Sequence, residues 1–170
     1  MIYYPNIADT RDILFPYIRS RLIEEEPAPL YDEEKRGLNG LQGIFGLMER
    51  DEYQGALAKA SYLFCSVIDG HHFSNGNKRL GVTLLLYFLL RNGYLVSMPD
   101  MEVIRSELMR LFPKVRWEEV RAFRYPHEYF FYHLALIVAD RKQKGQMSFR
   151  QEQEAVAQLL QAVMVPPRRA

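Results

Sequence analysis

The segment 77–92, which reads NKRLGVTLLLYFLLRN, constrains the fold more than any other part of the chain. Its apolar residues lie on nearly all sides of a helix, and such a helix must be covered by other elements all round. Gly93 follows at the position where glycine commonly ends a helix. The longest apolar run, 82–90, is about half of the ~20 residues that cross a bilayer. The sequence therefore predicts the central helix of a bundle and no membrane partner.

Proline, glycine and apolar spacing predict the other elements. A first helix is expected to begin at Asp9 or Thr10 and to run toward Glu26, with a kink or a break at Pro16. Further helices are predicted over 52–69, 101–112, 116–123, 127–142 and 148–164, with a short extended segment over 94–98. The expected fold class is all-α, or mainly α.

The length of 170 residues fits one domain, 1–170, with 146–164 as a C-terminal helical extension of it. The net charge of +1 gives no electrostatic reason to expect a nucleic-acid partner. The single Cys65 excludes an internal disulfide framework and is expected to be a small buried residue. Residues 1–6 lack the pattern of a secretory signal, so a cytoplasmic location is expected.

The segment 71–79 carries the parts of an anion site. His71 precedes a glycine turn that opens the central helix, and Lys78 and Arg79 stand in the first turn of that helix. The first amides of a helix have no intrahelical acceptor and attract anions, whereas cations there are unfavourable unless an anion is bound. Histidine can carry a proton at neutral pH. These residues together indicate phosphate binding combined with proton transfer.

The pattern H-x-F-x-x-G-N-K-R of this segment resembles the signature of the Fic/Doc superfamily. Its Lys-Arg ending is closer to the Doc (death-on-curing) branch than to the G-N-G-R ending of AMP-transferring Fic proteins. The apolar run from Leu80 to Leu90, followed by Arg91-Asn92-Gly93-Tyr94, is similar to the L-x-F-L-x-x-N-G-Y of that family. The resemblance extends over about residues 38–95 and implies a Fic-fold helical bundle.

The resemblance also implies roles for the residues of the motif. His71 would be the general base that takes the proton of a target hydroxyl. The phosphates of ATP, or of another nucleoside triphosphate, would be held by Gly76, Asn77, Lys78 and Arg79. The neighbouring His72 falls on a variable position and is interpreted as structural.

Two positions depart from the family pattern. Asn75 stands where the family has an acidic residue that holds Mg²⁺, so Asn75 is the predicted magnesium contact although its amide brings no charge. Val82 stands where AMP-transferring members have a second arginine, which Doc-like members lack. These departures keep a second interpretation open, in which the protein is a binding or regulatory protein with a decayed catalytic site.

Glycines recur at positions 37, 40, 43 and 46, in a segment interpreted as a loop over 31–46. The resemblance places a small flap or β-hairpin here, on which a target protein would dock near Gly40–Gly46 by strand addition. A plain loop is the alternative.

The last helix also has two interpretations. Ser148 and Gln151 form a capping-box pattern, as expected of a helix that packs or mediates a homo-oligomer. Ser148 and Glu152 also match part of the self-inhibition motif S/T-x-x-x-E-G/N of the superfamily.

The expected function is transfer of AMP or phosphate from a nucleoside triphosphate to a hydroxyl of a target protein. The Doc-like ending further implies a toxin restrained by a small antitoxin protein. Besides the decayed binding protein, a His/Asn metal-dependent nuclease is a rival, but its ββα scaffold needs strands around the histidine, where this sequence predicts helices.

Overall fold

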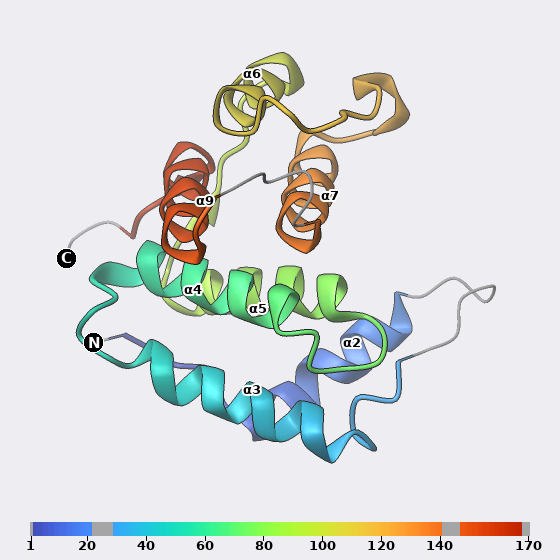
Figure 1. The fold of residues 1–170 in the computed structure, drawn as a ribbon, viewed down its shortest axis with the longest axis vertical. Coiled ribbons are helices and arrows are strands. Elements are labelled where there is room, and N and C mark those ends of the chain that lie inside the picture. The colour runs from blue at the N-terminus through green and yellow to red at the C-terminus, as the bar shows by residue number, and fades with distance from the viewer. Residues whose placement is uncertain (1, 22–28, 141–146, 168–170) are drawn as a thin grey trace.

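The computed structural model describes residues 2–21, 29–140 and 147–167, and these are mainly helical (Figure 1). The mainly α class is therefore confirmed. In chain order the elements are α1 (Ile7–Asp9), the π-helical turn η1 (Thr10–Leu14), α2 (Phe15–Ser20), α3 (Lys35–Met48), α4 (Gly55–Asp69), α5 (Asn77–Arg91), β1 (Leu95–Val96), α6 (Met101–Leu111), the 3₁₀ turn η2 (Val120–Ala122), α7 (Pro126–Ala139), α9 (Phe149–Val163) and β2 (Met164–Val165).

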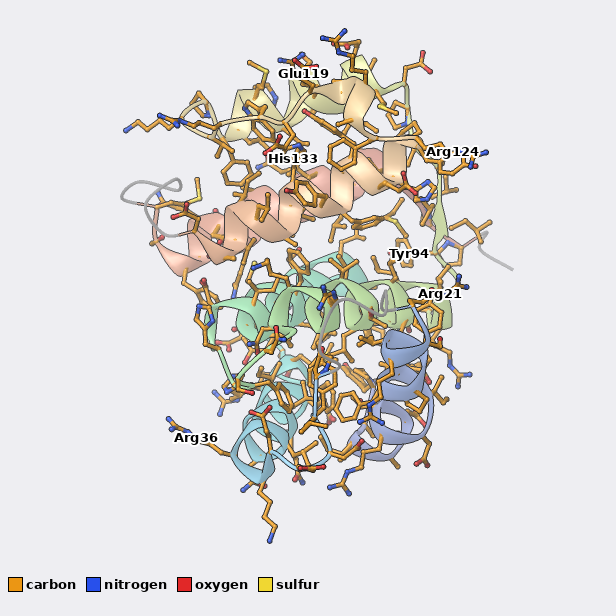
Figure 2. All side chains as sticks on the ribbon, turned by 90° about the vertical axis from the view of Figure 1, so that its right-hand side faces the viewer. Arg21, Arg36, Tyr94, Glu119, Arg124 and His133 are labelled. Carbon is orange, nitrogen blue, oxygen red and sulfur yellow. The ribbon has the colours of Figure 1, made fainter. Side chains whose placement is uncertain are left out.

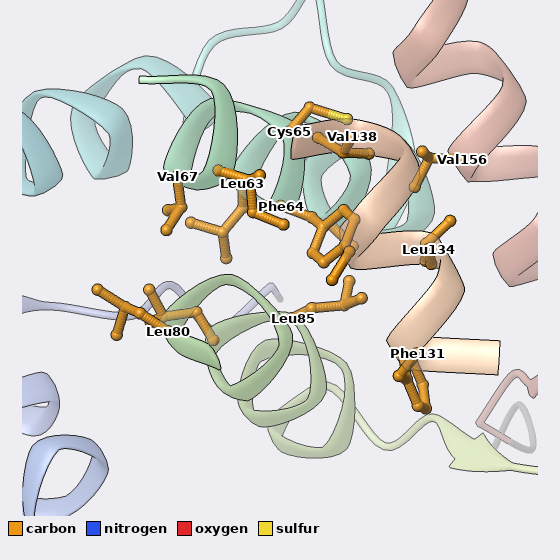
Figure 3. Close-up of a cluster of buried hydrophobic side chains, with 14 of the residues drawn as sticks. Leu63, Phe64, Cys65, Val67, Leu80, Leu85, Phe131, Leu134, Val138 and Val156 are labelled. Carbon is orange, nitrogen blue, oxygen red and sulfur yellow. The ribbon is translucent and has the colours of Figure 1, made fainter. Parts of the chain in front are cut away.

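Helices α4 and α5 lie side by side across the middle of the molecule, with α2 and α3 on one side and α7 and α9 on the other (Figure 1). The two approach closely at Gly81, where an added Cβ would come within 2.7 Å of Ile68. The shared core joins buried side chains of four helices (Figure 3), among them Phe64 of α4, Leu85 of α5, Leu134 of α7 and Val156 of α9. The predicted central position of α5 follows from this burial. None of the helices in the described ranges is long and apolar enough to cross a bilayer.

Strands β1 and β2 form a short antiparallel pair, with Leu95 opposite Val165 and Val96 opposite Met164. They join the end of α5 to the end of α9, which itself packs on α4. The predicted capping box at Ser148 is present, since its hydroxyl accepts from the backbone N–H of Gln151 at 3.3 Å. The 146–164 extension therefore packs against the rest of the bundle.

The first helix begins earlier than predicted. Asn6, rather than Asp9 or Thr10, caps it, because its side chain accepts from the backbone N–H of Asp9 at 2.8 Å. The helical path passes through the π turn η1 directly ahead of Pro16, whose missing N–H does not suit an α-helix interior. Its predicted continuation toward Glu26 lies outside the described residues.

Smaller boundary differences occur elsewhere. Helix α4 begins at Gly55 rather than at residue 52, and the predicted helix 116–123 is only the turn η2. Helix α7 ends at Ala139, and its predicted continuation to Lys142 lies outside the described residues.

The prediction of a loop and flap over 31–46 is wrong, because α3 occupies most of that segment. Its apolar face, with Leu38, Leu41, Phe45 and Met48, is buried in the core. Each glycine in a helix interior costs about 1 kcal/mol relative to alanine. Burial of a leucine or phenylalanine side chain contributes roughly 1.5–3 kcal/mol, so packing outweighs the glycines.

Two glycines of α3 permit close contact with the chain that follows α4. A Cβ on Gly37 would lie 2.5 Å from the ring of Phe73, and a Cβ on Gly40 would overlap the imidazole of His72. By contrast, Gly43 has nothing within 4 Å of its Cβ position. Gly37 and Gly40 therefore allow close packing near the N-terminal end of α3, whereas Gly43 makes no such contact.

Helix α7 carries His133 on the side that faces α6 (Figure 2). The side chain is 1% exposed, and neither ring nitrogen has a hydrogen-bond partner within the described residues. Four aromatic rings surround it at centroid distances of 4.4–5.8 Å: Trp117, Phe123, Tyr129 and Tyr132. Burial, together with the nearby charge of Arg105, lowers the pKa of His133 to about 4.

We expect Gly37→Ala and Gly43→Ala to change stability in opposite directions. The first places a methyl group against Phe73 and the backbone oxygen of His72 and should destabilise the fold by about 1–3 kcal/mol. The second meets nothing and should stabilise the fold by about 0.5–1 kcal/mol through helix propensity. Urea denaturation of the two variants checks this, and changes of the same sign would contradict the packing described for α3.

We expect the stability of the fold to rise with pH between about 4 and 6.5. In that window the unfolded chain binds a proton at His133, whose ordinary pKa is 6.5, while the folded chain does not. The contribution approaches about 1.4 kcal/mol per pH unit. Urea denaturation at several pH values should therefore give a flatter pH profile for His133→Leu than for the wild type. Equal slopes would contradict a neutral, buried His133.

Candidate functional site

A cavity of about 690 Å³ opens at the N-terminal end of α5, between α2 and α7. We call it the α5 cavity. It is lined by all the residues that the motif singled out, namely His71, Asn75, Gly76, Asn77, Lys78 and Arg79. The structure therefore brings the predicted site residues to one place.

The loop between α4 and α5 sends successive side chains in different directions. His71 adopts a left-handed backbone conformation with φ 42°, which is uncommon for a residue other than glycine, and its side chain is exposed at the α5 cavity. His72 turns to the other side, where it fits against Gly40 and Gly70. Phe73 is buried against Tyr31, with ring centroids 5.0 Å apart. The loop thus leaves His71 exposed at the α5 cavity while the two residues that follow it are packed against their neighbours.

The Asn77 side chain forms its hydrogen bonds within this loop. Its Oδ1 accepts from the backbone N–H of Phe73 at 3.1 Å, and its Nδ2 donates to the carbonyl of the same residue at 2.6 Å. The side chain is therefore committed to the loop, and only the backbone of Asn77 remains for a phosphate. No side chain caps the N-terminus of α5, so its first amides have no intrahelical acceptor.

Two side chains from the segment just before α3 form hydrogen bonds with the loop between α4 and α5. The Tyr31 hydroxyl donates to the carbonyl of Gly76 at 2.9 Å, and Glu34 accepts from the amide and the hydroxyl of Ser74 at 2.8 and 2.7 Å. Gly76 has φ 78°, and a Cβ there would collide with the Tyr31 hydroxyl, so only glycine fits. Sequence reasoning missed Tyr31 and Glu34, since no local pattern marks partners so distant along the chain.

The polar end of the α5 cavity is positively charged. Arg21, Lys78 and Arg79 line it, and no aspartate or glutamate is among its lining residues in the described part of the chain. These cations add to the positive end of the α5 dipole. An anion is therefore the ligand that this end favours.

Other parts of the α5 cavity lining are apolar and aromatic. Helix α7 contributes Phe131, Tyr132, Ala135 and Leu136, and Tyr17 of α2 faces the same space. Tyr17 and Tyr132 remain 50% and 43% exposed, so their rings are accessible to a ligand. A molecule with a phosphate group at one end and a flat or apolar group at the other fits this arrangement.

Asn75, the predicted magnesium contact, and the residues around it are poor ligands for Mg²⁺. The Asn75 Oδ1 accepts from the amide of Gly76 at 2.6 Å, and Mg²⁺ is usually bound through carboxylates, of which the described lining residues provide none. Within the described residues, no group of three or more His, Cys, Asp or Glu is arranged to hold a metal ion.

A second cavity of about 710 Å³ lies between α3 and α9, and we call it the α3–α9 cavity. It is lined by His72 and Glu152, neither of which lines the α5 cavity. Burial, with the charges of Arg36 and His71, lowers the pKa of His72. Glu152 is 2% exposed and does not line the α5 cavity with the predicted phosphate-binding turn, which favours the packing interpretation of α9 over self-inhibition. Cys65 is buried in the core.

Comparison of the chain with protein-family models, with curated proteins and with solved structures finds no match. The relation to the Fic/Doc superfamily therefore stays a prediction from the motif.

We expect Asn77→Ala to destabilise the fold by about 1–2 kcal/mol, because it leaves the N–H and the carbonyl of Phe73 without their side-chain partner. Asn75→Ala is the matched control, since its side chain is exposed and bonds only the adjacent amide. Urea denaturation and hydrogen exchange at the Phe73 amide provide the measurements. Faster exchange in the control than in Asn77→Ala would contradict the closing role of Asn77.

Proposed function

We propose that the protein transfers AMP or phosphate from a nucleoside triphosphate to a hydroxyl group of a target protein. The observation that carries the proposal is the shared α5 cavity, where His71 and an uncapped, cation-rich helix N-terminus meet. A proton acceptor and a phosphate site in one cavity are the parts that this reaction requires. The resemblance to the Doc branch supports the same reaction and a small antitoxin as a partner.

In the proposed reaction the target hydroxyl oxygen attacks phosphorus while the imidazole of His71 takes its proton. The bond from phosphorus to the leaving oxygen breaks as the new bond forms. Pyrophosphate leaves if AMP is transferred, and the nucleoside diphosphate leaves if phosphate is transferred. The first amides of α5, Lys78 and Arg79 stabilise the charge on the phosphate oxygens.

The mode of target docking differs from the one that the family resemblance implies. Strand addition near Gly40–Gly46 needs a free strand edge, and these residues lie inside helix α3. Ser74, Asn75 and Lys78 are exposed at the rim of the α5 cavity. We infer that a target hydroxyl enters across this rim.

A binding or regulatory protein with a decayed catalytic site is the second candidate. Two observations favour it: Asn75 bonds the adjacent amide, and a helix occupies the place of the docking flap. Such a protein would retain nucleotide binding at the α5 cavity without transferring a group to a target.

We expect His71→Ala to reduce target modification by about 10²–10⁴-fold, the usual contribution of a positioned general base. The full chain is incubated with ATP and candidate target proteins, and mass spectrometry measures the added mass, which separates AMP from phosphate. His127→Ala is the control, because His127 is exposed and lies outside the α5 cavity. Wild-type activity that survives His71→Ala would overturn the catalytic role, and nucleotide binding without any transfer would favour the second candidate.

A further inference from the structure

We infer that Arg21 is a phosphate-binding residue of the α5 cavity, and that protein cations there take the place of a bound magnesium ion. This rests on the proposed function, since it concerns how the same nucleotide is held. Arg21 lies outside the motif, at the C-terminal end of α2, and no local sequence pattern connects it with residues 71–79.

The first step of the inference is the charge that the ligand brings. The phosphates of a nucleoside triphosphate carry several negative charges, which need positive partners when they leave bulk water. A metal ion supplies them where carboxylates hold it. Here the described lining residues include no carboxylate, and the side-chain oxygen of Asn75, the predicted metal contact, accepts from the Gly76 amide. The donor set therefore favours an anion over a cation.

The second step is the position of Arg21. It stands at the end of α2 that is nearer to α5 (Figure 2), and its side chain lines the α5 cavity together with Lys78 and Arg79. Helix α2 contacts α5, and the residue that follows its last turn, Arg21, lines the same cavity as the uncapped N-terminus of α5. Arg21 and Lys78, which come from two separate elements, thus line one cavity, and their mutual repulsion favours a bound anion.

The third step is the availability of these side chains. Among the described residues, neither Arg21 nor Lys78 forms an ion pair with a carboxylate. The guanidinium of Arg21 lies over the ring of Tyr17, 5.4 Å from its centroid. A guanidinium resting on an aromatic face keeps the N–H groups of its edge for a ligand, and that edge matches two phosphate oxygens. Tyr17 therefore orients Arg21 for phosphate.

The test is calorimetric titration of ATP into the full chain, once with EDTA and once with excess magnesium chloride. We expect the wild type to bind ATP in both media, with dissociation constants within about threefold of each other. Arg21→Ala should weaken binding about tenfold or more in EDTA, the scale of a lost hydrogen bond to a charged group. Arg21→Lys, which keeps the charge but loses the planar fork, should weaken it less.

Arg124→Ala is the matched control. Arg124 is also exposed and lies over a neighbouring tyrosine ring, 5.1 Å from the centroid of Tyr125, but outside the α5 cavity. Its removal should leave ATP binding unchanged. ATP binding that requires magnesium and is unaffected by Arg21→Ala would overturn the inference and leave the proposed function standing. No ATP binding to the wild type in either medium would overturn both.

Discussion

The structure depends on the close packing of the loop between α4 and α5 against its neighbours. Glycines at positions 37, 40 and 70 let helix backbone approach the side chains of His72 and Phe73 more closely than any other residue would. His72 and Phe73 pack against these neighbours, whereas His71, directly before them, is exposed and lines the α5 cavity. Close packing thus fixes the two residues that follow the proposed proton acceptor.

Local signals in the sequence predicted the parts of the fold that local chemistry governs. Helix α5, its glycine terminator and the capping box at Ser148 follow from periodicity and end signals, and they were correct. The 31–46 segment was misjudged because glycines suggest a loop, whereas the buried apolar face of α3 outweighs their cost. The burial of that face depends on packing partners from other segments, which local sequence patterns do not specify.

The candidate site likewise has residues that local sequence patterns predicted and residues that they did not. The motif pointed to His71 and to the proposed phosphate-binding turn, because those groups are neighbours along the chain. Tyr31, Glu34 and Arg21 come from distant segments, so no spacing rule connects them with the motif. The role expected of the Asn77 side chain also changed, since its amide matches both polar groups of Phe73 and is used internally. The sequence motif thus predicted the candidate groups, whereas the residues that support them were found only in the structure.

The pairing of β1 with β2 has a consequence for the order in which the chain assembles. Val165 meets Leu95, and the backbone of Tyr3 is held by the Asn92 side chain at the same end of α5. During synthesis α5 leaves the ribosome long before its partner strand, so its C-terminal end stays open until the last helix has emerged. The loop that carries His71 sits at the opposite end and needs only earlier segments to close it. The loop can therefore close before the last helix emerges, whereas the α5 cavity is complete only once α7 has joined it.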